Sequence, residues 1–272
     1  AIPGVAILLT VLAVSLVGWA RGGPAKVAVL SGVLSGTISG SSVGYVVASG
    51  MITIPMMRRV GYDRSTAGAI EATSSTGGQI TPPVMGAGAF LMAEITGIAY
   101  TEIALAAIIP CLLFYIACYV HCDLHAVKNG LRGLPRSELT PIGVMMRKVY
   151  LLSPIFILIG TLLMGYSEFR AGTLGVLSAL VVSWLSREHR MGVKSTLTAL
   201  EIAARETAQL VAICACAGII VGVIALTGIG GRFSHVILTI AGENQILAMF
   251  FAMLISLVLG MGMPTTAAYA VA

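Results

Sequence analysis

The sequence predicts an all-α polytopic membrane protein in which re-entrant helical hairpins and broken helices accompany ordinary spans. Of its 272 residues, 57% are hydrophobic and 10% are charged, whereas an average globular domain carries about 25% charged residues. The 32 Gly and 10 Pro are typical of membrane helices that break or pack closely. The net charge of +5 comes with no basic stripe interleaved with aromatic residues, which excludes nucleic acid as a partner.

The first two elements are a transmembrane helix over 1–20 and a re-entrant hairpin over 24–57. The chain starts without Met or a charged n-region, so 1–20 is a span rather than a signal peptide, and we expect the chain to be part of a longer polypeptide. The charge-free run 27–57 would, as one helix, exceed a bilayer core of about 30 Å by half. Ser39-Gly40-Ser41-Ser42 at its midpoint favours a turn between two half-length helices.

The next element is a broken helix over 66–91. Its middle reads Ser74-Ser75-Thr76-Gly77-Gly78-Gln79-Ile80-Thr81-Pro82-Pro83. Two prolines remove backbone donors and Gly-Gly weakens the helix, so the span unwinds here. Hydroxyls and freed carbonyls then form a neutral, oxygen-rich patch at the depth of the hairpin turn. A helix over 103–122 completes a first transport repeat over 24–122.

The second half begins with a cytoplasmic connector over 123–148 and two transmembrane helices within 149–186. The remainder, 195–272, holds an amphipathic interfacial helix from Ser195, a span over 207–226 and a truncated hairpin over 245–272. This layout places every Lys and Arg on the cytoplasmic side except Arg170 and Arg232, as the positive-inside rule requires. The basic residues therefore report orientation.

The last element resembles the first hairpin. Ser31–Ser42 reads SGVLSGTISGSS and Ile255–Thr266 reads ISLVLGMGMPTT, each an apolar arm followed by a Gly and hydroxyl turn. The second enters from the opposite side by the charge distribution, which is the pattern of inverted-topology repeats that meet at the midplane. Residues 195–272 are therefore predicted to start a second, inverted repeat.

At this point the residues resemble a known family. Ser39-Gly40-Ser41, Ile54-Pro55-Met56, Gly61-Tyr62-Asp63, Ala67–Ala72 and Ser75–Pro83 look like the large membrane subunit of TRAP (tripartite ATP-independent periplasmic) transporters. Gly77-Gly78-Gln79 followed by Val84-Met85-Gly86 is most similar to the fused permeases that work with TAXI-type binding proteins. Gly262-Met263-Pro264-Thr265-Thr266 matches the start of the family's second hairpin.

The resemblance implies a secondary active transporter in the prokaryotic inner (cytoplasmic) membrane. It implies sodium-coupled uptake of an organic acid, either a C4-dicarboxylate, a 2-oxoacid or a glutamate-like compound, by an elevator-type movement. A periplasmic binding protein of the TAXI type would deliver the substrate. The partners are then that protein, the organic acid and the lipid bilayer, with Na⁺ as coupling ion and no other cofactor.

Candidate site residues follow from the chemistry of sodium, a hard cation suited by neutral oxygen ligands. The predicted sodium ligands lie at the hairpin turn and the helix break: Ser39, Gly40, Ser41, Ser42, Ser75, Thr76, Gly77, Gly78 and Gln79. The predicted substrate residues, where half-helix N-termini could hold a carboxylate, are Ser42, Thr81, Pro82, Pro83, Met263, Pro264, Thr265 and Thr266. The competing interpretation is that the small residues only let helices pack closely.

Other chemistry stays open at a few positions. Glu71 is an acidic residue inside a span, so it is a candidate proton site, although a structural role paired with a cytoplasmic basic residue is the preferred interpretation. Cys118, His121, Cys122 and His125 share one helix face with metal-ligand residue types. An intramembrane serine protease at Ser39 or Ser41 is disfavoured because no His lies mid-span to activate it. A purely structural subunit would not need two midplane breaks.

Overall fold

A computed structural model describes residues 2–135, 149–185, 192–228, 239, 244–261 and 269. Every element within this part of the chain is helical. The contacts divide the chain into two units, one formed by residues 1–86 and 97–196 and the other by residues 87–96 and 197–272. The first unit holds the predicted hairpin and the first part of the predicted broken helix, and it positions most of the candidate site.

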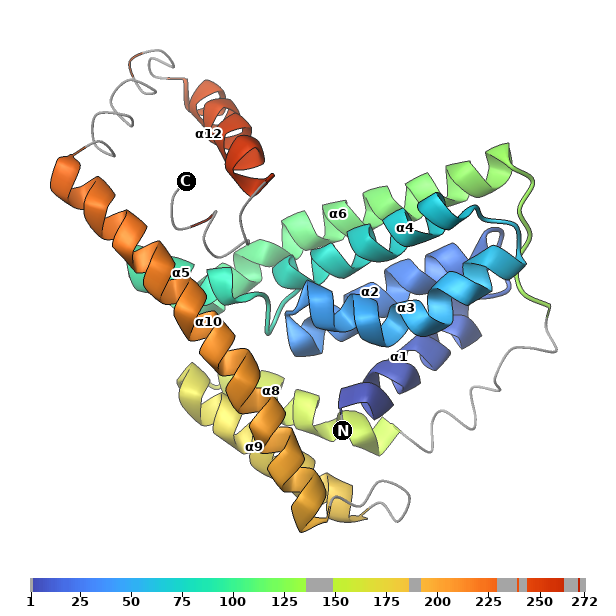
Figure 1. The fold of residues 1–272 in the computed structure, drawn as a ribbon, viewed down its shortest axis with the longest axis horizontal. Coiled ribbons are helices and arrows are strands. Elements are labelled where there is room, and N and C mark those ends of the chain that lie inside the picture. The colour runs from blue at the N-terminus through green and yellow to red at the C-terminus, as the bar shows by residue number, and fades with distance from the viewer. Residues whose placement is uncertain are drawn as a thin grey trace. The chain divides into compact units, whose positions relative to one another are not determined.

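The hairpin consists of α2 (Gly23–Ser39) and α3 (Ser42–Arg59), preceded by α1 (Ile2–Val17). Gly40 ends α2 with φ +57°, a left-handed conformation that favours glycine. Ser41 then caps α3 by accepting a hydrogen bond from the backbone N–H of Gly44, as N-cap serines commonly do. The two helices lie side by side (Figure 1). We call Gly40–Ser42 the tip.

The predicted broken helix begins with α4 (Arg64–Thr76), which continues as a 3₁₀ turn, η1 (Gly77–Ile80). Asp63 caps α4 by accepting from the backbone N–H of Thr66 at 3.0 Å. After Ile80 the chain turns to extended backbone at Thr81 and enters the cis Pro82-Pro83 bond. We call Gly77–Thr81 the break. Its residue types explain why the α-helix ends here, since Gly-Gly weakens it and Pro-Pro cannot continue it.

The helix α6 (Tyr100–Lys128) completes this bundle, and it contacts α2, α4 and η1. The core between these helices combines small and medium side chains, among them Ala25, Ala28 and Cys111, with the larger Tyr62 and Tyr115. The outer face of α6 exposes Leu105, Ile109, Leu112, Leu113 and Ile116. Among the described residues, α6 alone is both long and apolar enough to cross a membrane, while α2, α9 and α12 are shorter apolar helices.

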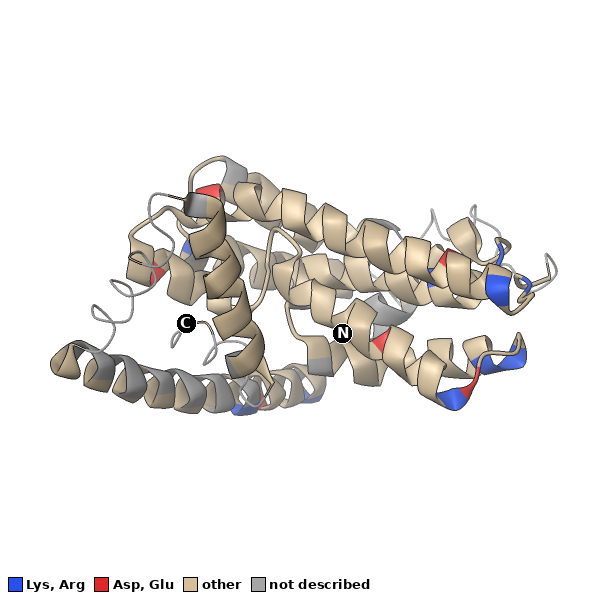
Figure 2. Ribbon diagram, turned by 90° about the horizontal axis from the view of Figure 1, so that it is seen from above, with Lys and Arg blue, Asp and Glu red and all other residues tan. Residues whose placement is uncertain are grey.

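Basic residues of this bundle gather at one end, and blue segments lie at the ends of helices in Figure 2. The residues there are Arg21 before α2, Arg58 and Arg59 at the end of α3, Arg64 at the start of α4 and Lys128 at the end of α6. We call this end the base. The hairpin therefore has a charged base and, about 25 Å away along α2, an uncharged tip.

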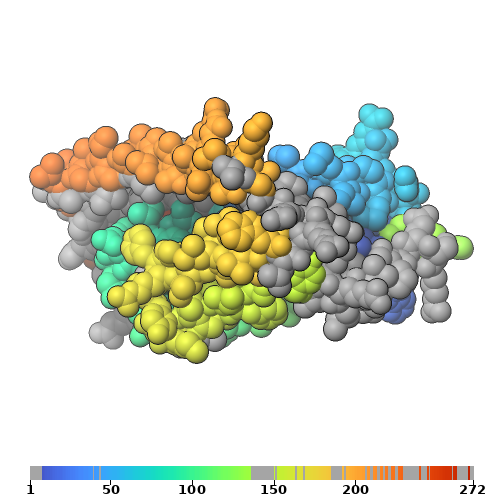
Figure 3. Space-filling view, turned by 90° about the horizontal axis from the view of Figure 1, so that it is seen from below, coloured from blue at the N-terminus to red at the C-terminus, as the bar shows by residue number. Residues whose placement is uncertain are grey.

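Two further helices of the same unit, α8 (Ser153–Leu163) and α9 (Glu168–Leu185), pack against each other. They expose large apolar side chains such as Phe156, Phe169 and Trp184. The two helices form the yellow-green to yellow surface in Figure 3. Water would not favour such a surface, whereas lipid or another apolar face would.

The second unit contains α5 (Ala87–Thr96), most of α10 (Val193–Thr227) and α12 (Gln245–Gly260). The sequence predicts an interfacial helix and a separate span over 207–226, but α10 runs through both as one helix. No proline interrupts this stretch, and Arg205 pairs with Glu201 one turn earlier at 2.9 Å, so nothing local breaks the helix. Residues 136–148 of the predicted connector and the predicted hairpin turn after Met261 lie outside the described residues.

Candidate ion and substrate site at the hairpin tip

The tip and the break meet directly. The side-chain amide of Gln79 donates a hydrogen bond to the hydroxyl oxygen of Ser42, with 2.8 Å between Nε2 and Oγ. These two residues are 37 positions apart in the chain and come from different predicted elements. The structure therefore brings together one predicted sodium ligand from the hairpin and one from the broken helix.

Three glycines of the hairpin, spaced four residues apart, place its backbone against the backbone around the break. A Cβ on Gly32 would lie 2.8 Å from the carbonyl oxygen of Ser74, and a Cβ on Gly36 would lie 2.6 Å from Cα of Gly78. At the tip, a Cβ on Gly40 would lie 1.8 Å from the carbonyl oxygen of Met85. Close packing by small residues, the competing interpretation, is thus present at the same place as the candidate ligands.

The hydroxyls of the broken helix donate to their own backbone. Ser75 donates to the carbonyl of Glu71 at 2.7 Å, Thr76 to the carbonyl of Ala72 at 2.8 Å, and Thr81 to the carbonyl of Gly77 at 2.8 Å. A hydroxyl has one proton and two lone pairs, so each oxygen keeps acceptor capacity for a cation. Neutral hydroxyl and carbonyl oxygens are the donor set that a hard cation requires. The residues present fit sodium in this respect.

The candidate ligands differ in burial. Ser75, Gly77, Gly78 and Thr81 are buried, whereas Ser41 and Thr76 are exposed. The backbone of Ser39 ends α2, but its side chain lies outside the described residues. The buried members surround the break, so the oxygen-rich patch belongs mainly to the broken helix, and the tip adds Gly40 and Ser42.

The predicted substrate residues are only partly described. Thr81 is 2% exposed and lies 3.5 Å from the hydroxyl of Tyr115. The carbonyl of Pro83 accepts a hydrogen bond from the hydroxyl of Tyr100 at 2.9 Å, which ties the loop after the break to the start of α6. Met263, Pro264, Thr265 and Thr266 lie outside the described residues, so their part of the site stays a prediction.

Glu71 is fully buried in α4, and its carboxyl contacts hydroxyls rather than a basic residue. Oε1 lies against the hydroxyl of Ser49 and Oε2 against the hydroxyl of Thr53, both on α3. Among the ion pairs formed by described residues, none includes Glu71. The cytoplasmic basic partner suggested for Glu71 is therefore not seen among the described residues, and the carboxyl is held by hydroxyls of α3 instead. Whether its role is structural or in proton transfer stays a prediction.

Sequence reasoning missed the polar stripe on α3 that receives Glu71. Tyr45, Ser49 and Thr53 recur every four residues and are all buried. The hydroxyl of Tyr45 lies beside those of Ser31 and Ser49, without a hydrogen bond of ordinary geometry to any described residue. The spacing of these residues could have predicted the stripe, because three hydroxyl residues four positions apart share one helix face. The surrounding residues are mostly apolar, so the segment was interpreted only as one helix of a membrane hairpin.

The face of α6 with metal-ligand residue types holds no metal cluster in the described part of the chain. His125 instead stacks on Tyr62, with ring centroids 5.6 Å apart. Cys122 is buried against the core of the first unit. These residues pack the base of the hairpin.

A chain whose described elements are all helical, and whose hairpin meets an interrupted helix through neutral polar groups, has the features of a membrane transport protein. The family described as "Tripartite ATP-independent periplasmic transporter, DctM component" matches residues 3–272, and the chain belongs to it. No curated protein matches the chain. Members are integral inner-membrane permeases of secondary transporters that work with a periplasmic substrate-binding protein. The chain is therefore a transporter permease and not an enzyme, which removes the protease alternative.

Proposed function

We propose that this permease couples the uptake of an organic acid to sodium entry, with the tip and the break as the ion and substrate site. The observation that carries the proposal is the hydrogen bond between Gln79 and Ser42, which joins the tip to a stretch of the broken helix that also carries the buried residues Ser75 and Thr81. This arrangement offers neutral oxygen ligands at a point where irregular backbone otherwise only costs stability. A C4-dicarboxylate, a 2-oxoacid or a glutamate-like acid is the proposed substrate.

The proposed delivery partner is a TAXI-type binding protein. The support is the sequence Gly77-Gly78-Gln79 at the break together with Val84-Met85-Gly86. In the structure the backbone N–H of Gly86 donates to the carbonyl of Gln79 at 2.7 Å, so the two segments form one folded unit behind the tip. The bond from Gly86 thus helps to hold the backbone of Gln79, whose side chain donates to Ser42.

The proposed movement is of the elevator type within an inverted repeat. Its support is the likeness between Ser31–Ser42 and Ile255–Thr266 and their opposite predicted directions across the membrane. Within the first unit, α2, α3, α4 and α6 pack closely through glycine and alanine contacts. A closely packed bundle of this kind is suited to move as one body.

Uptake into proteoliposomes tests the coupling. The permease is reconstituted with its binding protein, and radiolabelled succinate, 2-oxoglutarate and L-glutamate are supplied with an inward gradient of either sodium or choline at constant pH. We expect uptake of one of these acids with sodium only, and a loss of about tenfold or more in Ser42→Ala, since removing one oxygen ligand and the Gln79 contact weakens the ion site. Ser178→Ala on α9 is the matched control. Equal uptake in choline would overturn the sodium proposal.

A second candidate, proton coupling through Glu71, is favoured by one observation. A fully buried carboxyl that contacts two hydroxyls, and no basic side chain among the described residues, is costly to keep charged inside a membrane protein. Each of these hydroxyls also lies within hydrogen-bonding distance of its i−4 carbonyl, Tyr45 for Ser49 and Ser49 for Thr53. The hydroxyls could therefore donate to a charged carboxyl or turn away and accept from a protonated one.

Glu71→Gln separates the two candidates, because glutamine keeps the shape and can still both donate and accept. Under sodium coupling, the variant keeps sodium-driven uptake. Under proton coupling, it loses uptake driven by an inward proton gradient and its dependence on pH. Glu102→Gln, an exposed carboxyl in the first turn of α6, is the control for the loss of one negative charge.

A further inference from the structure

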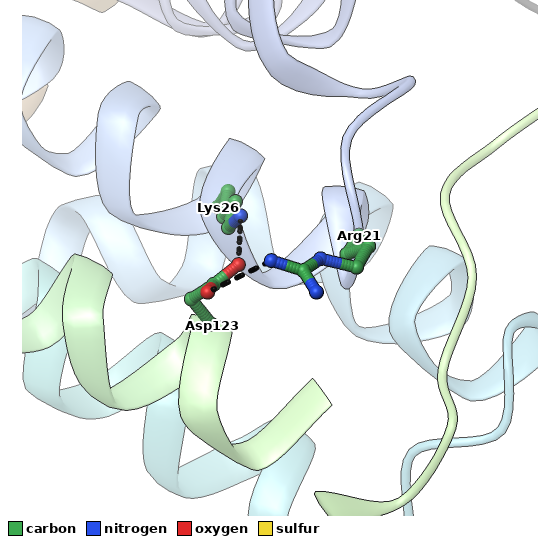
Figure 4. Close-up of polar contacts among 3 residues, drawn as sticks. All are labelled: Arg21, Lys26 and Asp123. Carbon is green, nitrogen blue, oxygen red and sulfur yellow. Dashed lines mark hydrogen bonds and ion pairs between the residues drawn. The ribbon is translucent and has the colours of Figure 1, made fainter. Parts of the chain in front are cut away.

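A charged cluster at the base joins α2 to α6, as Figure 4 shows. Lys26 in the first turn of α2 donates a charged hydrogen bond to Asp123 near the end of α6, with 2.5 Å between Nζ and Oδ1. Its other carboxylate oxygen lies 3.6 Å from a guanidinium nitrogen of Arg21. The two basic residues therefore contact the same acidic side chain from the start of the hairpin.

The two contacts differ in strength because they differ in burial. The side chain of Lys26 is 6% exposed and that of Arg21 is 69% exposed, while the carboxylate of Asp123 that both contact belongs to a side chain 29% exposed. The buried partner of the pair is thus the ammonium of Lys26. The ammonium of Lys26 also lies 4.8 Å from the centre of the Tyr119 ring, a distance at which a cation and an aromatic face attract each other. An exposed pair contributes little, whereas loss of one partner from a buried pair leaves a charge without compensation. The contact that matters is thus Lys26 with Asp123.

The helix that carries Lys26 also carries the glycines that meet the break. It runs without interruption from Gly23 to Ser39, so a displacement of Lys26 along the helix axis is transmitted to the tip, about 20 Å away. At Gly36 and Gly40 the helix has no side chain to absorb such a displacement, because backbone lies against backbone. The position of α2 along its axis therefore decides whether Ser42 meets Gln79.

The geometry points to Asp123 as a positioning residue for the tip. By holding Lys26, it fixes the axial position of α2 against α6, and through α2 it fixes the contact of the tip with the break. The geometric effect of Asp123, the alignment of Ser42 with Gln79, is independent of the proposed function. Its effect on function, a higher affinity of the site for sodium, rests on the proposed function.

Cross-linking measures that alignment directly. Ser42→Cys and Gln79→Cys are introduced into the reconstituted permease after its five native cysteines are replaced by alanine, and a short bifunctional methanethiosulfonate links them. We expect Asp123→Asn to slow cross-linking by about tenfold, because a buried cation without its partner displaces the helix that carries it. Asp123→Glu restores the rate, and Glu102→Gln on the same helix leaves it unchanged.

The double variant Lys26→Met, Asp123→Asn keeps the inference testable if Asp123→Asn does not fold, since it buries no unpaired charge. We expect it to fold and still to cross-link several-fold more slowly than the parent. Cross-linking at the parent rate would overturn the inference and leave the pair as charge compensation alone. In the permease without the added cysteines, the half-saturating sodium concentration should rise in the same variants. If cross-linking slows and no variant or parent depends on sodium, the positioning role stands and the sodium proposal falls.

Discussion

The two ends of the hairpin are held by different kinds of interaction. At the base, a partly buried ion pair and the stacked rings of Tyr62 and His125 join α2, α6 and the turn before α4. At the tip, glycine backbone contacts and one neutral hydrogen bond join α2 and α3 to the break. Full charges are strongly hydrated at the membrane surface and costly inside it, so each kind of contact occurs where its environment permits it.

This difference has a functional consequence. Under the proposed function, the tip and the break would offer a cation hydroxyl and carbonyl oxygens without burying a fixed negative charge, which is costly inside a membrane protein. The base, which needs no exchange of ligands, can use a strong charged contact to hold the arrangement in place.

The largest effect is expected from Gly40→Ala at the tip. The residue has φ +57°, and a Cβ would lie 1.8 Å from the carbonyl oxygen of Met85, so alanine adds both backbone strain and a clash with backbone. We expect a loss of roughly 3 kcal/mol or more in the stability of the first unit. The measurement is the apparent unfolding temperature of the purified permease in detergent. Gly68→Ala, where nothing lies within 4 Å, should leave it unchanged or slightly raised.

Removal of the hydroxyl of Ser49 tests the polar stripe that lies between tip and base. In Ser49→Ala, Oε1 of Glu71 loses its hydroxyl partner in a fully buried position, which should cost about 1 to 3 kcal/mol. Ser15→Ala, whose hydroxyl donates to Val11 in its own helix at 3.1 Å, should cost less. The same thermal measurement applies. Equal losses in the two variants would show that the Glu71 contact adds nothing to stability.

A pair of Tyr→Phe variants compares the tip side with the base. Tyr100 donates to the carbonyl of Pro83 behind the break, so Tyr100→Phe should lower stability by about 1 kcal/mol. Tyr62 at the base is buried, and its hydroxyl has no hydrogen-bond partner among the described residues. Tyr62→Phe should therefore be neutral or slightly stabilising. A larger loss of stability in Tyr62→Phe than in Tyr100→Phe would mean that the hydroxyl of Tyr62 makes a stabilising polar contact at the base.

Local sequence chemistry predicts the hairpin and the break because each depends on a few neighbouring residues. Ser39-Gly40-Ser41-Ser42 specifies a turn whatever surrounds it, and α2 ends at Ser39 with Gly40 in a left-handed conformation. Gly77-Gly78 and Pro82-Pro83 end the α-helix in the same local way, and the structure has a 3₁₀ turn there. The family membership that the motifs suggested is confirmed by the match over residues 3–272.

Contacts between distant segments could not be predicted in this way. Lys26 and Asp123 are 97 positions apart, and the charge pattern placed both only near the cytoplasmic surface. The partners of Glu71, Ser49 and Thr53, were missed for the same reason, since they become visible only when α3 packs against α4. The continuity of α10 was also missed. Its first part is amphipathic and its second part is apolar, which suggested two elements, although one helix can contain both kinds of segment.

The smallest effect is expected at Asp63, the N-cap of α4 at the base. Hydrogen bonds from the side chain of Ser65, and then from Thr66, hold the pKa of this carboxyl well below its ordinary value of 3.8. A depressed pKa in the folded state means that the carboxylate stabilises the fold above pH 3.8 and loses this contribution as the pH falls through the folded-state pKa. Near neutral pH, Asp63→Asn should lower stability only slightly, because asparagine also caps a helix but lacks the charge of the carboxylate. Unfolding temperatures measured from pH 7 downward should show this small difference shrinking below pH 3.8, as the parent loses the contribution of its carboxylate. A difference that grows in acid would contradict this role of the carboxylate.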